Sequence, residues 1–477
     1  MSQGHRQGAR GFSWFAIARL GLIQACLGGV VVLATSTLNR IMVVELALPA
    51  LLPGVLVAMH YLVQILRPRM GFGSDIAGRC SPFILGGMVI LALGGLLGAY
   101  AVVLMSTALS LGIALSFVAF FLIGLGVSAC GTSVLVLLAK RVDDTRRAGA
   151  ATLVWLLMIA GFAITAGTAG HFLDPYSEAR LLAVAATVTG LAIVATALLL
   201  AGLERQAEPH AAAYRPEPEL NFRLALRQVW NEPEARHFTI FVFVSMLAFS
   251  AQDLILEPFA GSVFGYTPGE TTKLSGLQHS GILIGMLVVA AAGSGRLFGR
   301  RLGSLKFWTI SGCIASGFAL AGLVAAGVYG PGWPLNWNVM LLGVANGAFS
   351  IAAIASMMRL ANEGRARREG TRMGLWGAAQ ALAFGAGGLL GTGLSDISRA
   401  LINDTALAYA TVFGLEALLF IVAARLASQI RESPSSPGNT MTQASALQAP
   451  QAPSALNPPG ARTALSPSHP APSGLAN

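Results

Sequence analysis

The chain has 477 residues, a mean hydropathy of +0.67 and only 11% charged residues. A soluble protein of this length needs far more polar surface, so the composition excludes a soluble globular fold. The formal net charge of +10 could indicate a nucleic-acid partner, but the basic residues lie in short segments between apolar stretches, as in membrane proteins. We therefore expect a protein of the lipid bilayer that binds no nucleic acid.

Twelve apolar segments are each long enough to cross the hydrocarbon core as a helix, so the predicted fold class is all-α integral membrane. They lie at roughly residues 15–38, 49–66, 82–103, 110–139, 149–172, 180–202, 237–257, 274–293, 303–328, 337–360, 371–393 and 406–427.

A polar segment after the sixth span divides the chain into two six-helix halves. The last residues are rich in Pro, Ser and Ala and cannot bury enough apolar surface to fold alone. The predicted parts are a cytoplasmic N-terminus (1–14), an N-terminal half (15–202), a cytoplasmic linker (203–236), a C-terminal half (237–431) and a disordered cytoplasmic tail (432–477).

The distribution of basic residues sets the orientation. Of 31 Lys and Arg residues, only Arg40, Arg180, Lys273 and Arg399 lie in the loops on one side of the predicted topology. Because basic residues concentrate on the cytoplasmic side, both termini and the linker are expected in the cytoplasm.

A weak repeat relates the two halves. A Gly and a Trp recur 221 residues apart, and an Asp that follows them recurs 222 residues apart. Parallel halves of this kind are the plan of the major facilitator superfamily. The repeated residues are Gly149, Trp155 and Asp174, and then Gly370, Trp376 and Asp396.

The segment "GFGSDIAGR" resembles the signature of that superfamily between its second and third helices. Gly71, Asp75, Gly78 and Arg79 match the pattern. Glycine permits a tight turn, and Asp75 could accept from a helix N-terminus and latch the halves at the cytoplasmic gate. The alternative is a surface turn with an isolated acid.

Two stretches, residues 38–75 and 252–277, resemble the PucC family, also called the bacteriochlorophyll delivery family. The most specific matches are Asn39-Arg40, Glu45, Pro49, Gln252-Asp253 and Leu256-Glu257-Pro258. The resemblance implies help in assembling light-harvesting complexes, in the bacterial inner (intracytoplasmic) membrane. The residues after Asp75 resemble a sister branch labelled bacteriochlorophyll synthase chain.

Charged and polar residues recur near the ends of the first and seventh spans. Asp253 and Glu257 lie four apart, on one helical face, and need a partner or a proton. We expect Arg40, Glu45, Gln252, Asp253 and Glu257 to form a polar cluster across the halves. It would clamp the halves or bind a polar group of the cargo, and simple helix-end capping is the alternative.

Histidine is the usual protein ligand for the magnesium of a chlorin. His60 and His279 lie in pseudo-equivalent spans, and His171 ends the fifth span. They are the pigment-binding candidates, although a hydrogen-bonded packing role explains each of them, and His171 has the position of an interfacial residue. Apart from the magnesium of a bound chlorin, no metal is expected.

The leading hypothesis is a protein that binds bacteriochlorophyll, or a late precursor, as cargo and passes it to antenna polypeptides or pigment-synthesis enzymes. No cofactor is expected to be tightly required. One alternative is a proton-coupled exporter of a small molecule, with the mid-span Glu416 as a possible proton site. Another is a non-catalytic subunit of a bacteriochlorophyll synthase system. The sequence contains no catalytic motif, so we do not expect the chain to be an enzyme.

Overall fold

The expected apolar segments are helical throughout the part of the chain that the computed structural model describes, residues 12–64, 79–204, 230–294, 303–363 and 369–430. No strand occurs in those ranges, and ten of their helices are long and apolar enough to cross a membrane. This confirms the all-α integral membrane class.

The first helical column is α1 (Trp14–Val32), η1 (Leu33–Thr37), α2 (Leu38–Arg40) and η2 (Ile41–Glu45). The others are α3 (Leu51–Val63), α5 (Ser81–Leu104), α6 (Leu109–Arg141), α7 (Asp144–Leu173), α8 (Glu178–Leu200), α10 (Pro233–Phe264), α11 (Pro268–Ser294), α12 (Leu305–Tyr329), η4 (Gly330–Gly332), α13 (Leu335–Glu363), α14 (Glu369–Leu401) and α15 (Thr405–Gln429).

Short polar side chains begin several of these helices. A Ser or Asp oxygen at the N-cap accepts from a backbone N–H of the first turn, which otherwise has no partner. Ser13, Ser177, Ser304 and Asp404 do this for α1, α8, α12 and α15.

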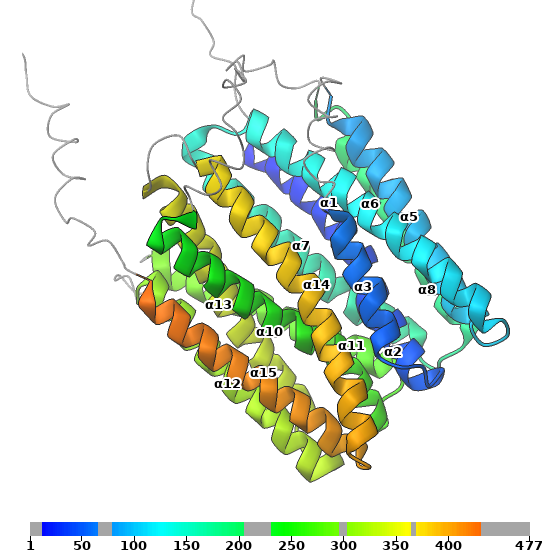
Figure 1. Ribbon diagram of the computed structural model, residues 1–477. Helices are drawn as coiled ribbons and strands as arrows, with labels where there is room; N and C mark the ends of the chain where they lie inside the picture. The colour runs from blue at the N-terminus through cyan, green and yellow to red at the C-terminus, as the bar shows by residue number, and fades with distance from the viewer. Residues whose placement is uncertain (1–11, 65–78, 205–229, 295–302, 364–368, 431–477) are drawn as a thin grey trace, which may run out of the picture. The chain divides into compact units, whose positions relative to one another are not determined.

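The helices form two bundles, each with its own apolar core. One core lies among α1, α3 and α5–α8, and the other lies among α10–α15. Between the bundles, α14 packs against α3 and α7 packs against α11 (Figure 1). We call this contact surface, together with the contacts of the first column on α10 and α11, the seam. The far end is the end of the bundles at which the first column, α7, α10 and α14 finish. Residues 205–229 and 431–477 lie outside the described ranges, and the proposed domain boundaries stay predictions.

The expectation that the seventh span stops near Glu257 is wrong. Helix α10 continues through Pro258 to Phe264, where Gly265 adopts φ +71° and ends it. A proline inside a helix has no N–H for the carbonyl four residues earlier, here that of Leu254. Asn39 of the first column supplies a replacement, because its Nδ2 donates to the Leu254 oxygen at 2.6 Å. A side chain from one bundle therefore completes the backbone hydrogen bonding of a helix in the other.

This replacement makes a prediction for Asn39→Ala. The variant leaves the Leu254 carbonyl buried without its donor, so the unfolding free energy should fall by about 1 kcal/mol. In a Pro258→Ala background, the restored N–H of residue 258 satisfies that carbonyl, and Asn39→Ala should then cost much less. A double-mutant cycle of unfolding midpoints in detergent measures this coupling. Equal losses in both backgrounds would contradict it.

Candidate functional site

The first column departs from regular α-helix where it reaches the seam. Two π-helical turns, Leu33–Thr37 and Ile41–Glu45, carry the column past the expected end at residue 38. Such wide turns frequently occur at functional sites. Here the extra length buries Asn39 and Arg40, which are 1% and 3% exposed.

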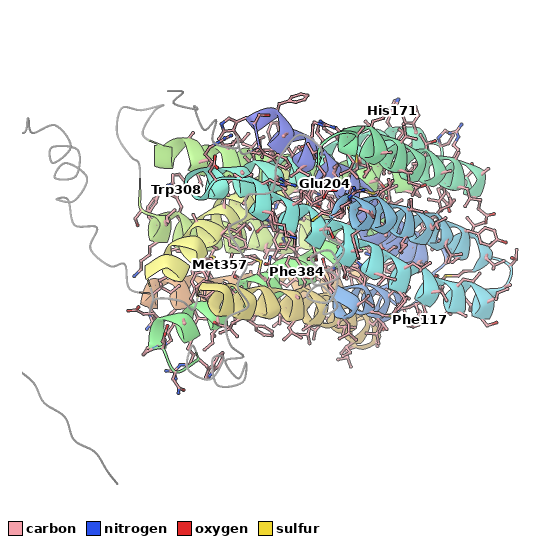
Figure 2. All side chains as sticks on the ribbon, turned by 90° about the horizontal axis from the view of Figure 1, so that it is seen from above. Phe117, His171, Glu204, Trp308, Met357 and Phe384 are labelled. Atoms are coloured by element: carbon pink, nitrogen blue, oxygen red, sulfur yellow. The ribbon has the colours of Figure 1, made fainter. Side chains whose placement is uncertain are left out.

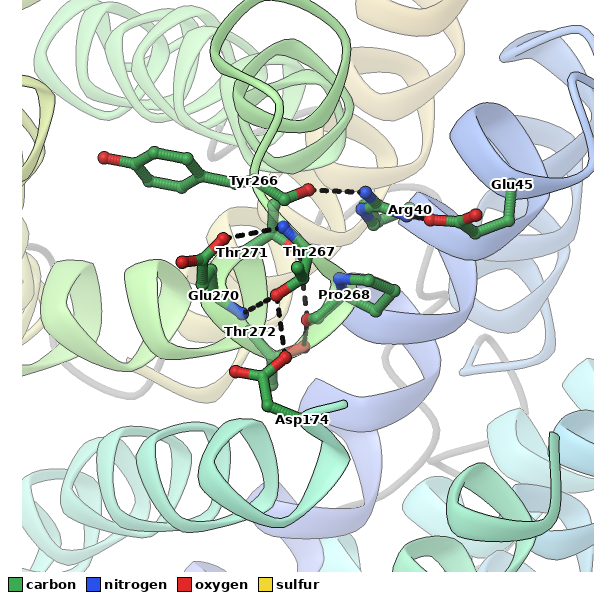
Figure 3. Close-up of polar contacts among 9 residues, drawn as sticks. All are labelled: Arg40, Glu45, Asp174, Tyr266, Thr267, Pro268, Glu270, Thr271 and Thr272. Carbon is green, nitrogen blue, oxygen red and sulfur yellow. Dashed lines mark hydrogen bonds and ion pairs between the residues drawn. The ribbon is translucent and has the colours of Figure 1, made fainter. Parts of the chain in front are cut away.

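Arg40 joins the two halves at the far end. Its guanidinium pairs with Glu45 of the same column, and its Nη2 donates to the Tyr266 carbonyl at 2.6 Å (Figure 3). Tyr266 belongs to the turn between α10 and α11 in the other half. Arg40 and Glu45 are thus in contact within the first column, and Arg40 is tied to the second bundle by a backbone contact.

Glu257 lies on the inner side of this contact. It is seven residues before the end of α10, about 10 Å from that end at 1.5 Å per residue, and it is 2% exposed. The Ser36 hydroxyl donates to its Oε1, and the charges of Arg40 and Asp253 both act on it. A buried carboxyl with an arginine and hydroxyl groups around it is the arrangement that a low-dielectric site requires.

The seam therefore contains a wider polar cluster than the sequence predicted. Arg40, Glu45, Asp253 and Glu257 are brought together, but Gln252 is fully buried and its side-chain amide makes no hydrogen bond within the described ranges. The missed members are hydroxyl residues of η1 and α11, which are common in apolar helices and carry no clear signal. They are Ser36, Thr37, Thr271, Thr272 and Ser275; the Thr37 and Thr272 hydroxyls are 3.0 Å apart.

His279 of α11 lies at the same seam. Its Nδ1 donates to the Ser275 carbonyl at 2.8 Å, and its ring stacks on Phe162 of α7, with the ring centroids 5.0 Å apart. This bond places a proton on Nδ1, so in a neutral imidazole the lone pair is on Nε2. Asp253 is close enough for its charge to interact with the imidazole. The Nδ1 bond thus leaves Nε2 as the ring nitrogen that can bind a metal, with an acidic side chain nearby.

His60 of α3 lies where the other pair of helices crosses the seam. Its neighbour Tyr61 stacks on Phe384 of α14, at a centroid distance of 5.3 Å. The Nε2 atoms of Gln64 and His60 are 3.0 Å apart. Since an amide nitrogen can only donate, the His60 Nε2 lone pair accepts this bond and is already engaged.

The remaining candidates lie apart from the seam. His171 is exposed near the far end of α7, at the edge of the view in Figure 2. Glu416 is buried in α15, and its oxygens have no hydrogen-bond partner within the described ranges. The gate residues Gly71, Asp75 and Gly78 fall outside the described residues, and their neighbour Arg79 is exposed.

Comparison with known proteins identifies relatives over most of the chain. The model of a family described as "PUCC protein" matches residues 37–434. The bacteriochlorophyll synthase 44.5 kDa chain of Rhodobacter capsulatus is 54% identical over 417 residues, which cover 87% of this chain and 95% of that protein. Protein PucC of Cereibacter sphaeroides is 29% identical, covering 84% of this chain and 88% of that protein.

Solved structures of transporters share the fold. The D-xylose–proton symporter aligns with a TM-score of 0.65 at 13% identity, covering 88% of this chain and 98% of that one. The nucleoside transporter NupG aligns with a TM-score of 0.61 at 13% identity, covering 87% and 99%. The major facilitator fold is therefore confirmed.

The cluster predicts a charge-balance effect. Arg40→Ala removes the cation that pairs with Glu45 and whose charge acts on the buried Glu257, so the unfolding free energy should fall by about 1–3 kcal/mol. Adding Glu257→Gln should recover part of that loss, because the amide carries no charge. Thermal unfolding in detergent compares the variants, with the exposed Arg180→Ala as control. If the double variant is no more stable than Arg40→Ala, the two side chains do not balance each other.

Proposed function

The chain belongs to the PucC family, and we propose that it binds bacteriochlorophyll or a late precursor within the bilayer and delivers it during assembly of the photosynthetic complexes. The recipients are antenna polypeptides or pigment-synthesis enzymes. Two relatives carry names that support this role: bacteriochlorophyll synthase 44.5 kDa chain and Protein PucC. The proposed location is the bacterial inner membrane, with both termini in the cytoplasm.

The observation that carries the proposal is the state of His279. Its Nδ1 proton is held by the Ser275 carbonyl, so Nε2 can offer a lone pair to the magnesium of a chlorin. A second hydrogen bond that fixes the tautomer is the usual arrangement of metal-binding histidines. His279 is thus a better candidate than His60, whose Nε2 already accepts from Gln64.

The surroundings of His279 suit a large apolar cargo with a few polar substituents. The apolar residues packed at this seam are Ile159 of α7, Ile282, Met286 and Val289 of α11, and Ala348, Ile351 and Ala352 of α13. Thr271 and Ser275, earlier in the same helix, interact with Glu257 through their hydroxyl groups. His279 is only 7% exposed, so a chlorin reaches it when the seam opens. Binding and release would then follow the opening and closing of the two halves.

We assign the chain a non-catalytic role in pigment handling. Prenyl transfer needs aspartate-rich loops that hold a diphosphate through magnesium, and the isolated Asp143–Asp144 pair is flanked by basic residues. A non-catalytic subunit of a synthase remains the alternative within the same pathway, with the pigment as substrate and no tightly held cofactor.

A second candidate, proton-coupled transport of a small molecule, has one observation in its favour. Asp253 and Glu257 form an acidic pair at the seam, close to Arg40 and His279. Acidic residues inside a membrane bundle commonly mark proton paths. This pair replaces Glu416 as the better proton site, because Glu416 is buried inside one half, on the helix that packs against α12 and α10.

Purification in mild detergent from a phototrophic host tests the pigment proposal. The absorption spectrum of the native protein should contain a bacteriochlorophyll-type band. His279→Ala should lose at least about tenfold of the bound pigment, because it removes the imidazole that would hold the magnesium. His60→Ala and His171→Ala serve as matched controls that should retain it. Colourless native protein that moves a soluble substrate into vesicles would favour the transporter.

A further inference from the structure

Two aspartates of the sequence repeat occupy matching places at the far end. Asp174 follows α7 in the N-terminal half, and Asp396 lies in the last turns of α14 in the C-terminal half. Each carboxylate reaches across the seam to the start of a helix in the other half. These starts belong to α11 and α3, the helices that carry His279 and His60.

Asp396 makes its contact through backbone groups alone. Its Oδ1 accepts from the Ala50 N–H at 2.9 Å, and its Oδ2 accepts from the Leu51 N–H at 2.7 Å. These N–H groups begin α3, where they have no partner within the helix and where the helix dipole favours a negative charge.

Asp174 contacts the start of α11 with side chains as well. Its Oδ1 accepts from the Thr267 hydroxyl at 2.7 Å, and its Oδ2 pairs with Lys273 at 2.8 Å (the Thr267 bond is drawn in Figure 3). Thr267 and Glu270 also cap this helix reciprocally, since the Thr267 N–H donates to Glu270 and the Glu270 N–H donates to Thr267. The turn that meets Asp174 is therefore rigid.

The helix turns behind both aspartates are in close contact across the seam. Four residues before Asp396, the side chain of Thr392 lies against Gly54 of α3. Four residues before Asp174, Gly170 lies against the backbone of Gly269 and Lys273 in α11. A Cβ at either glycine would collide, so the far end holds these helices at the shortest possible separation.

We propose that Asp174 and Asp396 are paired latches that hold the two halves together at the far end and must release before the seam can open there. Each latch joins a carboxylate of one half to a helix N-terminus of the other, and the two are related by the repeat. Opening at this end breaks both sets of contacts, while opening at the other end leaves them intact. This inference does not depend on the identity of the cargo.

The pH dependence of the Asp174 latch follows from its surroundings. Partial burial alone would raise the pKa of the Asp174 carboxyl. The hydrogen bonds from Lys273 and Thr267 together have a larger, opposite effect, so this pKa lies below its usual value. Its stabilisation is complete above the pKa of about 3.9 of an unperturbed Asp and is lost only as the pH falls below that value. The latch is thus closed at neutral pH and responds to movement of the helices, not to physiological acidity.

Pulsed electron paramagnetic resonance on purified, pigment-free protein tests the proposal. Spin labels are placed at Thr107 and Gly332, exposed far-end turns of the two halves, after replacement of the four native cysteines. Asp174→Asn and Asp396→Asn should each raise the ratio of long to short distances about tenfold. The double variant should raise it more than either single variant.

Two comparisons decide the result. Glu178→Gln removes an exposed carboxylate near Asp174 and should leave the distances unchanged. A preserved helical circular dichroism signal in all variants shows that each of them is folded. Unchanged distances in the folded double variant would overturn the proposal, and so would an equal shift in Glu178→Gln. Since no pigment is present, this outcome is independent of whether His279 binds a chlorin.

Discussion

The structure depends on partnering a buried carboxyl group of one half with polar groups of the other. Glu257 lies inside α10, and its neighbours Ser36 and Arg40 come from the first column. Lipid offers no alternative partner, so these groups are satisfied only while the two bundles are docked. The polar cluster thus gives the seam a specific register that apolar packing of Leu, Ile and Gly would leave loosely defined.

The fold could be predicted because a bilayer imposes a strict length and composition on each crossing segment. The apolar stretches indicate two halves built of membrane-spanning helices, and residues such as Trp155 and Trp376 indicate the repeat. The ends of helices were harder to place, because the sequence shows a Pro at 258 but does not show the partner that makes a proline tolerable inside α10. That partner, Asn39, lies 215 residues away from the carbonyl it serves.

Much of the candidate site was visible in the charged residues, and the rest was hidden for physical reasons. Arg40, Asp253 and Glu257 are conspicuous in apolar segments, so they could be grouped before their contacts were known. Ser36 and Thr272 are not conspicuous, and their role depends on the π-helical turns of the first column, which no local pattern predicts. Gln252 was expected in the cluster together with Asp253, but successive helical residues point about 100° apart, and only Asp253 reaches the cluster.

The bond from Asn39 to the Leu254 carbonyl has a mechanical consequence. The Leu254 carbonyl of α10 has no hydrogen-bond donor in its own helix, and its donor, Asn39, lies in the neighbouring bundle. While the bundles are in contact, α10 is a continuous and stiff helix. When the bundles separate, the Leu254 carbonyl loses its donor, and the turn just before Pro258 becomes the place where α10 bends most easily. Docking of the two bundles therefore also stiffens α10.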